Sequence, residues 1–416
     1  MKHVVMLESN TSGSGFRAIR EARDSGHEIT FVTRDVTHYT RKDPRVRSML
    51  DCAHEILETE TNDIPALVDE MRRLETRRPV HGVMTYGDYY TEAVARVAVA
   101  LDLPGPDPEA VAVARNKHRS RVSLAHLPFT PAFEITTRPE HVPGALRRVG
   151  LPCVVKPVDR NSGGDVRKVA TEQEAVEHAS RIFTAGRNAR GQEASKVALF
   201  EEFIEGSEYS VETFGGGATI AVIGVTTKEL VGHPHFVEAE HLFPAPLPAE
   251  AENEAIACVL KALYEIGLTF GPAHTEVKLT PCGPRIIEIN PRLGGNLIPD
   301  LVRLATGFDL GRTLLLATTG EPVDLSVTRS RVAGIRFLTA DRAGVLTSYA
   351  INENIEQIPG LESWSITAAP GRPVSPPTDN NHYLGHVIAT AETAGGVVAA
   401  LDAAAAAIDL QIEECA

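Results

Sequence analysis

The stretch AHTEVKLTPCGPRIIEINPRLGGN, residues 273–296, places the tightest limit on how this chain can fold. Two runs of alternating apolar and polar residues flank the breaker TPCGP at 280–284, which predicts a β-hairpin with its turn near Cys282. A turn at that position sets Glu276 opposite Glu288, because the two positions are symmetric about Cys282. Directly opposed side chains lie roughly 4.5–5.5 Å apart at Cβ. Any fold of this chain must therefore accommodate two facing carboxylates.

Alternation along the two strands divides this hairpin into a polar face and an apolar face. The polar face is expected to carry Glu276, Lys278, Glu288 and Asn290. The apolar face is expected to turn Val277, Leu279, Ile287 and Ile289 toward the core. Arg292 follows on the polar side and adds a rigid cationic fork suited to phosphate or carboxylate.

Two carboxylates that face each other on paired strands repel, so the pattern predicts a cation between them. Glu276, Glu288 and the Asn290 amide offer hard oxygen ligands, with no Cys or His in line. Such a set suits Mg²⁺, which takes few protein carboxylates and completes its shell with phosphate and water. The alternative is a solvated charged hairpin that holds no ion.

The first third of the chain alternates short apolar runs with helical patterns, which predicts parallel βαβ units. Strands are expected at 3–7, 28–33 and 80–87, and helices at 16–26, 64–75 and 90–103. Gly13 and Gly15 follow the first strand in the pattern G-x-G-x-x-A, and Arg34 and Asp35 lie about twenty residues further on. This is the fingerprint of a dinucleotide fold, so an NAD(P)-binding module is one alternative function. If the phosphate-binding groups lie elsewhere, the glycines form only a tight turn that caps the following helix.

The sequence changes character after the breaker PGPDP at 104–108. Strands of an antiparallel sheet are expected at 153–158, 197–204, 208–215, 219–230, 273–279 and 285–290. Helices are expected at 297–307 and 309–320, each ended by glycine. The last segment, 321–416, has the strands VAGIRFLTA and LGHVIATA, a Pro-rich loop between them and a final Ala-rich helix.

Composition excludes several classes of protein. The formal net charge of −14 argues against a nucleic-acid partner, because such binding depends on clusters of Lys and Arg. The five cysteines are odd in number and lack C-x-x-C spacing, which favours reduced thiols and a cytoplasmic location. No apolar run has the length of a membrane span, and the opening stretch lacks the features of a signal peptide.

The hairpin pattern E276…E288-I-N290-P-R292-L-G-G resembles the metal hairpin of ATP-grasp ligases. The other segments expected in that family occur earlier in the chain, in the expected order. The resemblance implies that Lys117 and Lys156 contact ATP, and that a glycine-rich loop covers its phosphates through Ser162, Gly163 and Gly164. It also implies a hinge that holds adenine, with Glu208 near the ribose. The implied hinge residues are Glu201, Glu202, Phe203 and Ile204.

The same resemblance implies the division of the chain and its fold class, α/β and α+β. A Rossmann-like N-terminal domain is expected at 1–113, without dinucleotide binding. The ATP-grasp domain is expected at 114–320, with a lid subdomain at about 122–205. A small C-terminal α+β lobe is expected at 321–416 and is similar to that of the L-amino acid ligase branch.

The segment KELVGHPHFVEAEHLFPAPLP, residues 228–248, resembles the part of those ligases that lines the amino-acid pocket. The resemblance implies Glu238 near a substrate ammonium and His241 near the reacting groups. Arg292, Gly294 and Gly295 are implied to border the substrate as well. A zinc site within the cluster of His233, His235, Glu238, Glu240 and His241 is the alternative.

The implied function is ATP-dependent ligation of a small-molecule carboxylate and an amine through an acyl phosphate, releasing ADP and phosphate. Two Mg²⁺ ions are expected, with Mn²⁺ able to substitute, and Arg292 is expected to stabilise the transferring phosphoryl group. A monomer or homodimer is expected, with neither nucleic acid nor membrane as partner. The alternative within the superfamily is a carboxylase-like or nucleotide-biosynthetic ligase.

Overall fold

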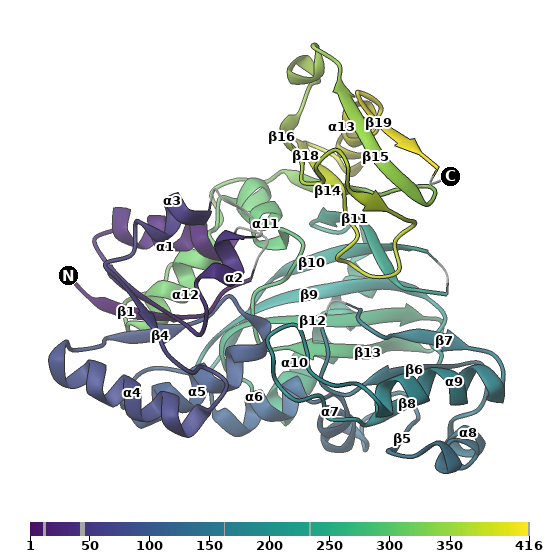
Figure 1. Cartoon of the computed structure of the whole chain (residues 1–416), viewed down its shortest axis with the longest axis horizontal. Coiled ribbons are helices and arrows are strands. Elements are labelled where there is room, and N and C mark those ends of the chain that lie inside the picture. Colours follow the sequence, from purple (N-terminus) through teal and green to yellow (C-terminus); the bar gives the residue numbers. More distant parts are fainter. Residues whose placement is uncertain (11–13, 42–45, 162, 233, 415–416) are drawn as a thin grey trace.

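In the computed structural model, the N-terminal third of the chain forms a four-stranded parallel sheet flanked by helices (Figure 1). The structure describes residues 1–416 apart from 11–13, 42–45, 162, 233 and 415–416. The strand order is β3-β2-β1-β4, with β1 (His3–Leu7), β2 (Glu28–Thr33), β3 (Glu55–Glu58) and β4 (Gly82–Met84). The helices are α1 (Ser14–Asp24), α2 (Thr37–Thr40), α3 (Val46–Leu50), α4 (Ile64–Arg77), the 3₁₀ turn η1 (Asp88–Tyr90) and α5 (Thr91–Ala100). The predicted parallel βαβ units are confirmed.

A small antiparallel sheet follows, with the order β5-β8-β6-β7. Its strands are β5 (Phe133–Thr136), β6 (Cys153–Pro157), β7 (Arg167–Val169) and β8 (Ala198–Glu202). Helices α8 (Val142–Val149) and α9 (Glu172–Phe183) share an apolar core with it through residues such as Leu146 and Phe200. The turn η2 (Pro139–His141) precedes α8. Helices α6 (Pro108–Arg115) and α7 (Lys117–Leu124) pack in a different apolar core, which they share with the large sheet described next.

An eight-stranded sheet, in the order β13-β12-β9-β10-β11-β14-β18-β16, forms the largest layer of the molecule. Five strands come from the middle of the chain: β9 (Ser207–Gly216), β10 (Ile220–Val231), β11 (Val237–Phe243), β12 (Phe270–Thr280) and β13 (Gly283–Asn290). Three come from the C-terminal segment: β14 (Val332–Leu338), β16 (Leu361–Ile366) and β18 (Gly385–Ala391). Helix α10 (Ala249–Glu265) packs on β12 and β13.

The C-terminal segment also forms a three-stranded sheet of its own, with the order β17-β15-β19. Its strands are β15 (Gly344–Ile351), β17 (Pro373–Val374) and β19 (Ile408–Glu413), with η3 (Ile355–Gln357) and α13 (Ala394–Ala406) beside them. Because β14 pairs with β11, the C-terminal segment continues the sheet of the preceding part (Figure 1).

The prediction of one antiparallel sheet for residues 153–290 is wrong, because β6 and β8 belong to the small sheet and β9, β10, β12 and β13 to the large one. The chain changes sheets between β8 and β9. There Gly206 adopts φ 144°, and a Cβ at this position would lie 2.2 Å from the Leu279 carbonyl oxygen. Only glycine allows such a close passage of two backbones. Phe203 and Ile204 therefore lie where the two sheets meet.

Helices α11 (Ile298–Thr306) and α12 (Leu310–Thr318) confirm the expected helices, and α11 ends at Gly307 in the left-handed conformation. Both helices pack against the N-terminal part of the chain. Leu301 and Leu315 share an apolar core with Val4 and Phe16. The core thus continues across residue 113, where a domain boundary was predicted.

The hairpin register confirms the central prediction, because Glu276 pairs with Glu288. The register shifts between Glu276 and Val277, so β13 carries one extra residue, Ile287. Ile286 therefore takes the core position, whereas Ile287 lines the cleft described below. The expectation that Ile287 faces the core was wrong, because strict alternation does not allow for a bulge.

Candidate active site

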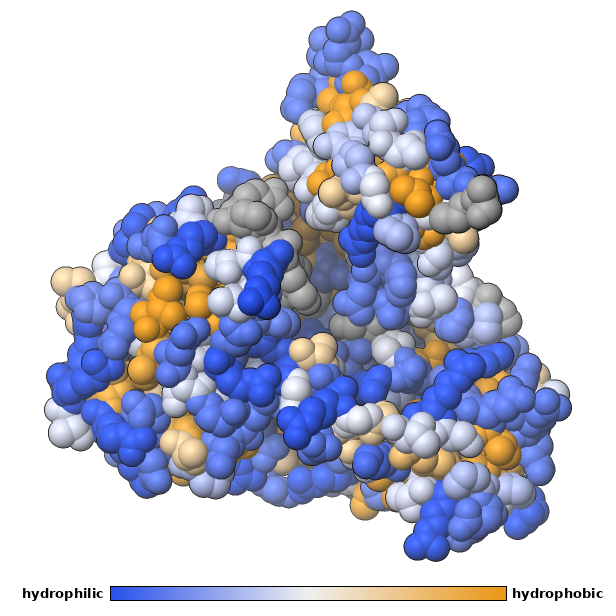
Figure 2. Space-filling model, in the orientation of Figure 1, coloured by the Kyte–Doolittle hydropathy of each residue, from blue (hydrophilic) through white to orange (hydrophobic). Residues whose placement is uncertain are grey.

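A cavity of about 420 Å³ is lined by residues from the N-terminal part, the small sheet, the large sheet and the C-terminal segment. Figure 2 shows a recess at the centre of one face, below the C-terminal segment. Most of the residues predicted as site residues line this cleft: Lys117, Lys156, Gly163, Glu201, Glu202, Phe203, Ile204, Glu208, Glu238, Glu276, Glu288, Asn290, Arg292, Gly294 and Gly295. Gly164 and His241 are not among the lining residues, and Ser162 lies outside the described residues.

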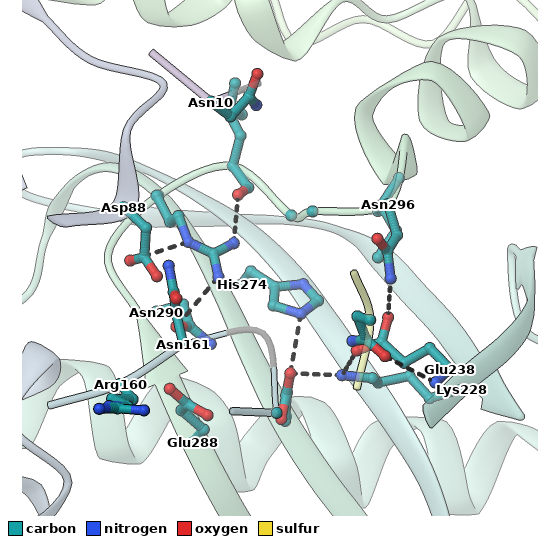
Figure 3. Close-up of a pocket in the computed structure, with 18 of the residues that line it drawn as sticks. Asn10, Asp88, Arg160, Asn161, Lys228, Glu238, His274, Glu288, Asn290 and Asn296 are labelled. Carbon is teal, nitrogen blue, oxygen red and sulfur yellow. Dashed lines mark hydrogen bonds and ion pairs between the residues drawn. The ribbon is translucent and has the colours of Figure 1, made fainter. Parts of the chain in front are cut away.

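The two facing carboxylates of the hairpin are each paired with a lysine. Lys117 Nζ lies 2.9 Å from Glu288 Oε1, and Lys228 Nζ lies 2.5 Å from Glu276 Oε1. Asn290, on the same strand as Glu288, is only 3% exposed and faces the cleft (Figure 3). The repulsion expected between the two carboxylates is thus offset by side chains that the sequence reasoning did not place beside them.

Lys228, on β10, is the centre of a buried charge cluster. Its ammonium lies 3.0 Å from Glu238, 2.5 Å from Glu276 and 3.7 Å from Glu208. Although burial opposes the charged form, these carboxylates raise the pKa of Lys228 well above its usual value. Burial raises the pKa of Glu208 to about 7. Lys228 was missed, since its partners come from three other strands.

His274, on β12, and Glu212, on the neighbouring strand β9, form a second buried pair. His274 Nδ1 lies 2.9 Å from Glu212 Oε1, and its Nε2 lies 3.4 Å from Glu276 Oε1. Although burial opposes protonation, Glu212 raises the pKa of His274 to about 9, so a charged imidazolium lies beside Glu276 on the same strand. His274, Glu276 and Lys278 alternate on β12, and that spacing is the signal that could have identified the histidine.

The side chain of Glu201, a residue expected in the adenine hinge, bridges two cations. Its carboxylate lies 2.6 Å from both Arg121 Nε and Lys156 Nζ, and the residue is only 4% exposed. Although burial opposes ionisation, Arg121 and Lys156 lower the pKa of Glu201. Two residues further along the hinge, Lys168 Nζ lies over the Phe203 ring, 3.6 Å from the ring centroid. The Glu201 side chain therefore positions Lys156 at the cleft.

Arg292 is held by the 3₁₀ turn η1. Its Nε lies 3.2 Å from Asp88 Oδ1, which also lies 2.7 Å from Arg115 Nη1. Although burial opposes ionisation, the two arginines hold the pKa of Asp88 well below its usual range. The next residue of the turn, Tyr89, donates its hydroxyl to Asn161 Oδ1 at 2.6 Å. One turn therefore contacts both Arg292 and the glycine-rich loop.

Glu238 lies at the opposite end of the cluster, beside the C-terminal segment. It accepts a hydrogen bond of 2.5 Å from Asn296 Nδ2, and its backbone is held by the Asn380 side chain and the Tyr383 hydroxyl. His241 Nε2 lies 2.9 Å from Glu238 Oε2, but His241 is fully buried and lies behind the cleft wall.

The alternative zinc cluster is not assembled in the described part of the chain. Glu240 pairs with Arg336 at 2.6 Å, away from Glu238. No group of three or more His, Cys, Asp or Glu side chains is placed to hold a metal ion among the described residues, and His233 lies outside them.

The glycine pattern near the N-terminus packs closely against the cleft wall. A Cβ on Gly15 would lie 2.1 Å from Ser9 Oγ and 2.8 Å from Tyr86 Cβ. Gly13 lies outside the described residues. Arg34 donates from Nη2 to the Arg190 carbonyl at 3.0 Å, and Asp35 accepts from the Thr37 amide at 2.8 Å, so both are engaged within the protein.

Comparison with known proteins agrees with this architecture. An ATP-grasp N-terminal domain model matches residues 19–105, an ATP-grasp domain model 149–300, and a model of L-amino acid ligase C-terminal domain 2 matches 336–413. The chain is 32% identical over 360 residues to the uncharacterized protein y4rH of Sinorhizobium fredii, covering 86% of this chain and 74% of the relative.

Two further relatives extend the likeness. Human carnosine synthase 1 is 26% identical over 354 residues, which cover 81% of this chain but only 42% of that enzyme. The crystal structure of an L-amino acid ligase from Bacillus licheniformis superimposes with a TM-score of 0.82 at 22% identity, covering 100% of this chain and 99% of that one.

The chain belongs to the ATP-grasp family. Within that family, residues 336–413 of this chain match the C-terminal domain 2 of L-amino acid ligases. Membership implies binding of ATP, use of a divalent metal and small-molecule substrates. Across the described residues, no helix has the length and apolar character needed to cross a bilayer.

Proposed function

We propose that this chain is an ATP-dependent ligase that joins a carboxylate to an amine through an acyl phosphate, releasing ADP and phosphate. The observation that carries the proposal is the single cleft wall on which Glu276, Glu288, Asn290 and Arg292 lie together, with Lys117 and Lys156 beside it. Amino acids or related metabolites are the proposed substrates, because the acidic side chain of Glu238 in the cleft suits an ammonium group.

The donor set fits a divalent metal. Glu276, Glu288 and the Asn290 amide oxygen would hold Mg²⁺, with a second Mg²⁺ ion shared with the phosphates and Mn²⁺ as a substitute. The metal, when bound, neutralises phosphate charge and aligns the terminal phosphoryl group. The two lysines now paired with Glu288 and Glu201 would turn toward the phosphates, and Gly163, with φ 69°, allows close approach of the loop backbone.

The remaining residues position the reactants. Arg292, fixed by Asp88, would stabilise the phosphoryl group in transfer and the oxygens of the acyl phosphate. Glu238 would orient the incoming amine, and His241 would keep the Glu238 carboxylate in place from behind. Gly294 and Gly295 would border the substrate.

The experiment combines the purified chain with ATP, Mg²⁺ and pairs of amino acids, and follows ADP, phosphate and amide by coupled assay and mass spectrometry. AMP and pyrophosphate as products would contradict the acyl-phosphate route. Hydrolysis of ATP that depends on bicarbonate and needs no amino acid would favour the carboxylase-like alternative. The L-amino acid ligase match at 336–413 supports the ligase reading.

The setting of the enzyme is part of the proposal. Cys52, Cys153, Cys258 and Cys282 are free thiols, which favours the cytoplasm, and Cys415 lies outside the described residues. A monomer or homodimer is expected, and light scattering of the purified chain measures which it is.

A further inference from the structure

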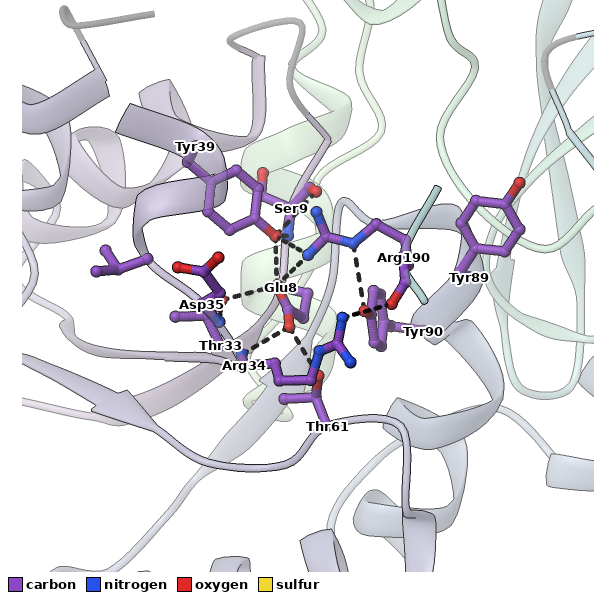
Figure 4. A network of polar contacts seen from close by, with 12 residues as sticks. Glu8, Ser9, Thr33, Arg34, Asp35, Tyr39, Thr61, Tyr89, Tyr90 and Arg190 are labelled. Atoms are coloured by element: carbon purple, nitrogen blue, oxygen red, sulfur yellow. Dashed lines mark hydrogen bonds and ion pairs between the residues drawn. The ribbon is translucent and has the colours of Figure 1, made fainter. Parts of the chain in front are cut away.

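A loop that follows the small sheet's helix α9 reaches into the N-terminal part of the chain (Figure 4). We name residues 184–197, which connect α9 to β8, the strap. Its tip is a tight turn in which Asn188 N donates to Gln192 O at 2.9 Å and Gly191 N donates to Asn188 O at 3.0 Å. Gly191 adopts φ 78°, and a Cβ there would lie 2.7 Å from Arg34. The turn therefore packs closely against the N-terminal part of the chain, and glycine at position 191 makes room for Arg34.

Arg190, at the tip of the strap, enters a buried socket. Its Nη2 donates to Glu8 Oε2 and, at 2.6 Å, to the Tyr39 hydroxyl, while its Nε donates to the Tyr90 hydroxyl at 3.2 Å. The guanidinium carbon lies 4.9 and 5.4 Å from the centroids of the Tyr39 and Tyr90 rings. The Arg190 carbonyl accepts further bonds of 3.0 Å from Arg34 and Asn62.

The socket is built around the carboxylate of Glu8, which is 0% exposed. Besides Arg190, Glu8 accepts hydrogen bonds from neutral donors. These are the Tyr39 hydroxyl and, at 2.7 to 2.9 Å, the Arg34 amide, Thr61 Oγ1 and Thr33 Oγ1. Removal of the guanidinium would leave a buried carboxylate without a cation, which is strongly unfavourable. The socket therefore requires a cation, and the strap supplies it.

Glu8 follows β1 directly, at the carboxyl edge of the parallel sheet, where open α/β sheets bind their ligands. In this chain the place is filled by its own Arg190. This occupation also argues against the NAD(P)-binding alternative.

The socket connects to the cleft through η1. Tyr90 is bound by Arg190, and the Tyr89 carbonyl accepts from Gln192 Nε2 at 3.3 Å. The Tyr89 hydroxyl holds Asn161 of the glycine-rich loop, and Asp88 holds Arg292. Three consecutive residues thus join the strap, the phosphate loop and the arginine of the cleft.

We propose that Arg190 is a positioning residue for ligation, which docks the strap on the N-terminal part and keeps the cleft closed while the acyl phosphate awaits the amine. The inference rests on the proposed function. With the strap undocked, water competes with the amine. The oxygen of the water molecule bonds to the acyl carbon, and the bond between that carbon and the phosphate oxygen breaks. Free carboxylate and inorganic phosphate leave, and the protons of the water pass to the solvent. ADP would then form without amide.

The test compares Arg190→Met and Arg190→Lys with the matched control Arg187→Met. Arg187 lies on the same strap, and its side chain is 64% exposed. It contacts Glu193 and the Gly191 carbonyl, both within the strap, at the surface. The ratio of ADP to amide should stay at about one in the wild type and the control, and rise about threefold or more in Arg190→Met. Arg190→Lys should fall between them, because an ammonium keeps the charge but loses the planar fork.

A proportional fall of ADP and amide in Arg190→Met, at an unchanged ratio, would overturn the proposal, since a merely structural role predicts that result. If Arg190→Met does not fold, Tyr90→Phe removes one hydroxyl of the socket and should raise the ratio in the same direction; an unchanged ratio overturns the proposal.

A wild-type chain that forms no ADP with any substrate pair would count against the proposed function rather than the strap. Hydrogen exchange over residues 186–194 then decides. Protection lost in Arg190→Met and kept in Arg187→Met supports docking by Arg190, and equal protection in both overturns it.

Discussion

Lys117 Nζ lies 2.9 Å from Glu288 Oε1, so a lysine expected at the phosphates and a carboxylate expected at the metal form one ion pair. Lys117 is 5% exposed, and neither charge could remain there alone without cost. ATP and metal arriving together would separate the pair and give each member a new partner. The pairing lets these two side chains neutralise each other before ligands bind.

The first prediction concerns this wall. Glu288→Gln keeps the shape of the side chain but removes a proposed metal ligand, so ADP formation should fall by about 100-fold or more. Glu109→Gln, which alters an exposed ion pair, is the control and should leave the rate unchanged. A titration of Mg²⁺ against initial rate measures both. Full activity in Glu288→Gln would refute the metal assignment.

The second prediction concerns Asp88. Asp88→Asn leaves Arg292 in place but removes the carboxylate that fixes it, so kcat should fall by about tenfold while KM for ATP changes little. Glu92→Gln, in the following helix, affects only an exposed pair with Arg96 and serves as the control. Equal loss in both variants would show that Asp88 does not act through Arg292.

The third prediction concerns acid stability. The pKa of Glu201 is lower in the folded chain than its ordinary value of 4.5, so the unfolded chain binds protons more readily between these two values. The stabilisation is therefore complete above pH 4.5 and is lost as pH falls through the folded pKa. Glu201→Gln should lower the free energy of unfolding at neutral pH by about 3 kcal/mol.

Because the titrating carboxylate is gone, Glu201→Gln should also weaken the acid dependence of stability. Urea unfolding at several pH values measures both effects. Glu134→Gln, in the same sheet, breaks only a surface pair with Arg148 and should change stability by less than about 1 kcal/mol. If the stability of Glu201→Gln depends on pH in the same way as that of the wild type, a group other than Glu201 is responsible for the loss of stability in acid.

The fourth prediction concerns the amine site. Glu238→Gln should raise KM for the amine substrate by about tenfold, with KM for ATP unchanged, since a charged hydrogen bond to the ammonium is lost. Glu240→Gln is the matched control, because Glu240 lies two residues further along β11 and pairs with Arg336. Steady-state kinetics with each substrate varied in turn distinguishes the two constants. A rise in KM for ATP alone would contradict the assignment.

The fifth prediction concerns Gly15. Gly15→Ala should destabilise the chain by about 1–3 kcal/mol, because the new methyl group overlaps Ser9 and Tyr86. Gly395→Ala, in α13, meets nothing within 4 Å and should be neutral or stabilising. Calorimetric titration should detect no NAD(P) binding in any of the three proteins. NAD affinity in the wild type that Gly15→Ala removes would restore the dinucleotide alternative.

Local patterns predicted much of this molecule. The period of two and the turn set Glu276 against Glu288, and the glycine after α11 ended that helix as expected. The bulge at Ile287 was not predictable from alternation, since one extra residue leaves no mark in the pattern. The strands β15, β16 and β19 also went unpredicted, because they pair with partners far along the chain.

The partners of the site residues were the harder part. Lys228, His274 and Asp88 reach the cleft through pairings between strands and turns that are distant in sequence. The local composition of a strand does not determine which strand will be its neighbour in the sheet. The sequence therefore identified charged residues such as Glu276 and Arg292, but not the oppositely charged residues that pair with them.

The pairing of β11 with β14 has a practical consequence for recombination between relatives. Glu240 on β11 faces Arg336 on β14, and Asn380 and Tyr383 hold the backbone of Glu238. A chimera with its crossover point near residue 321 would replace the C-terminal segment and, with it, the support of the strand that presents Glu238. Exchange of that segment should therefore change which amine substrate the enzyme selects. A chimera meant to keep the substrate selectivity unchanged would need its crossover point elsewhere.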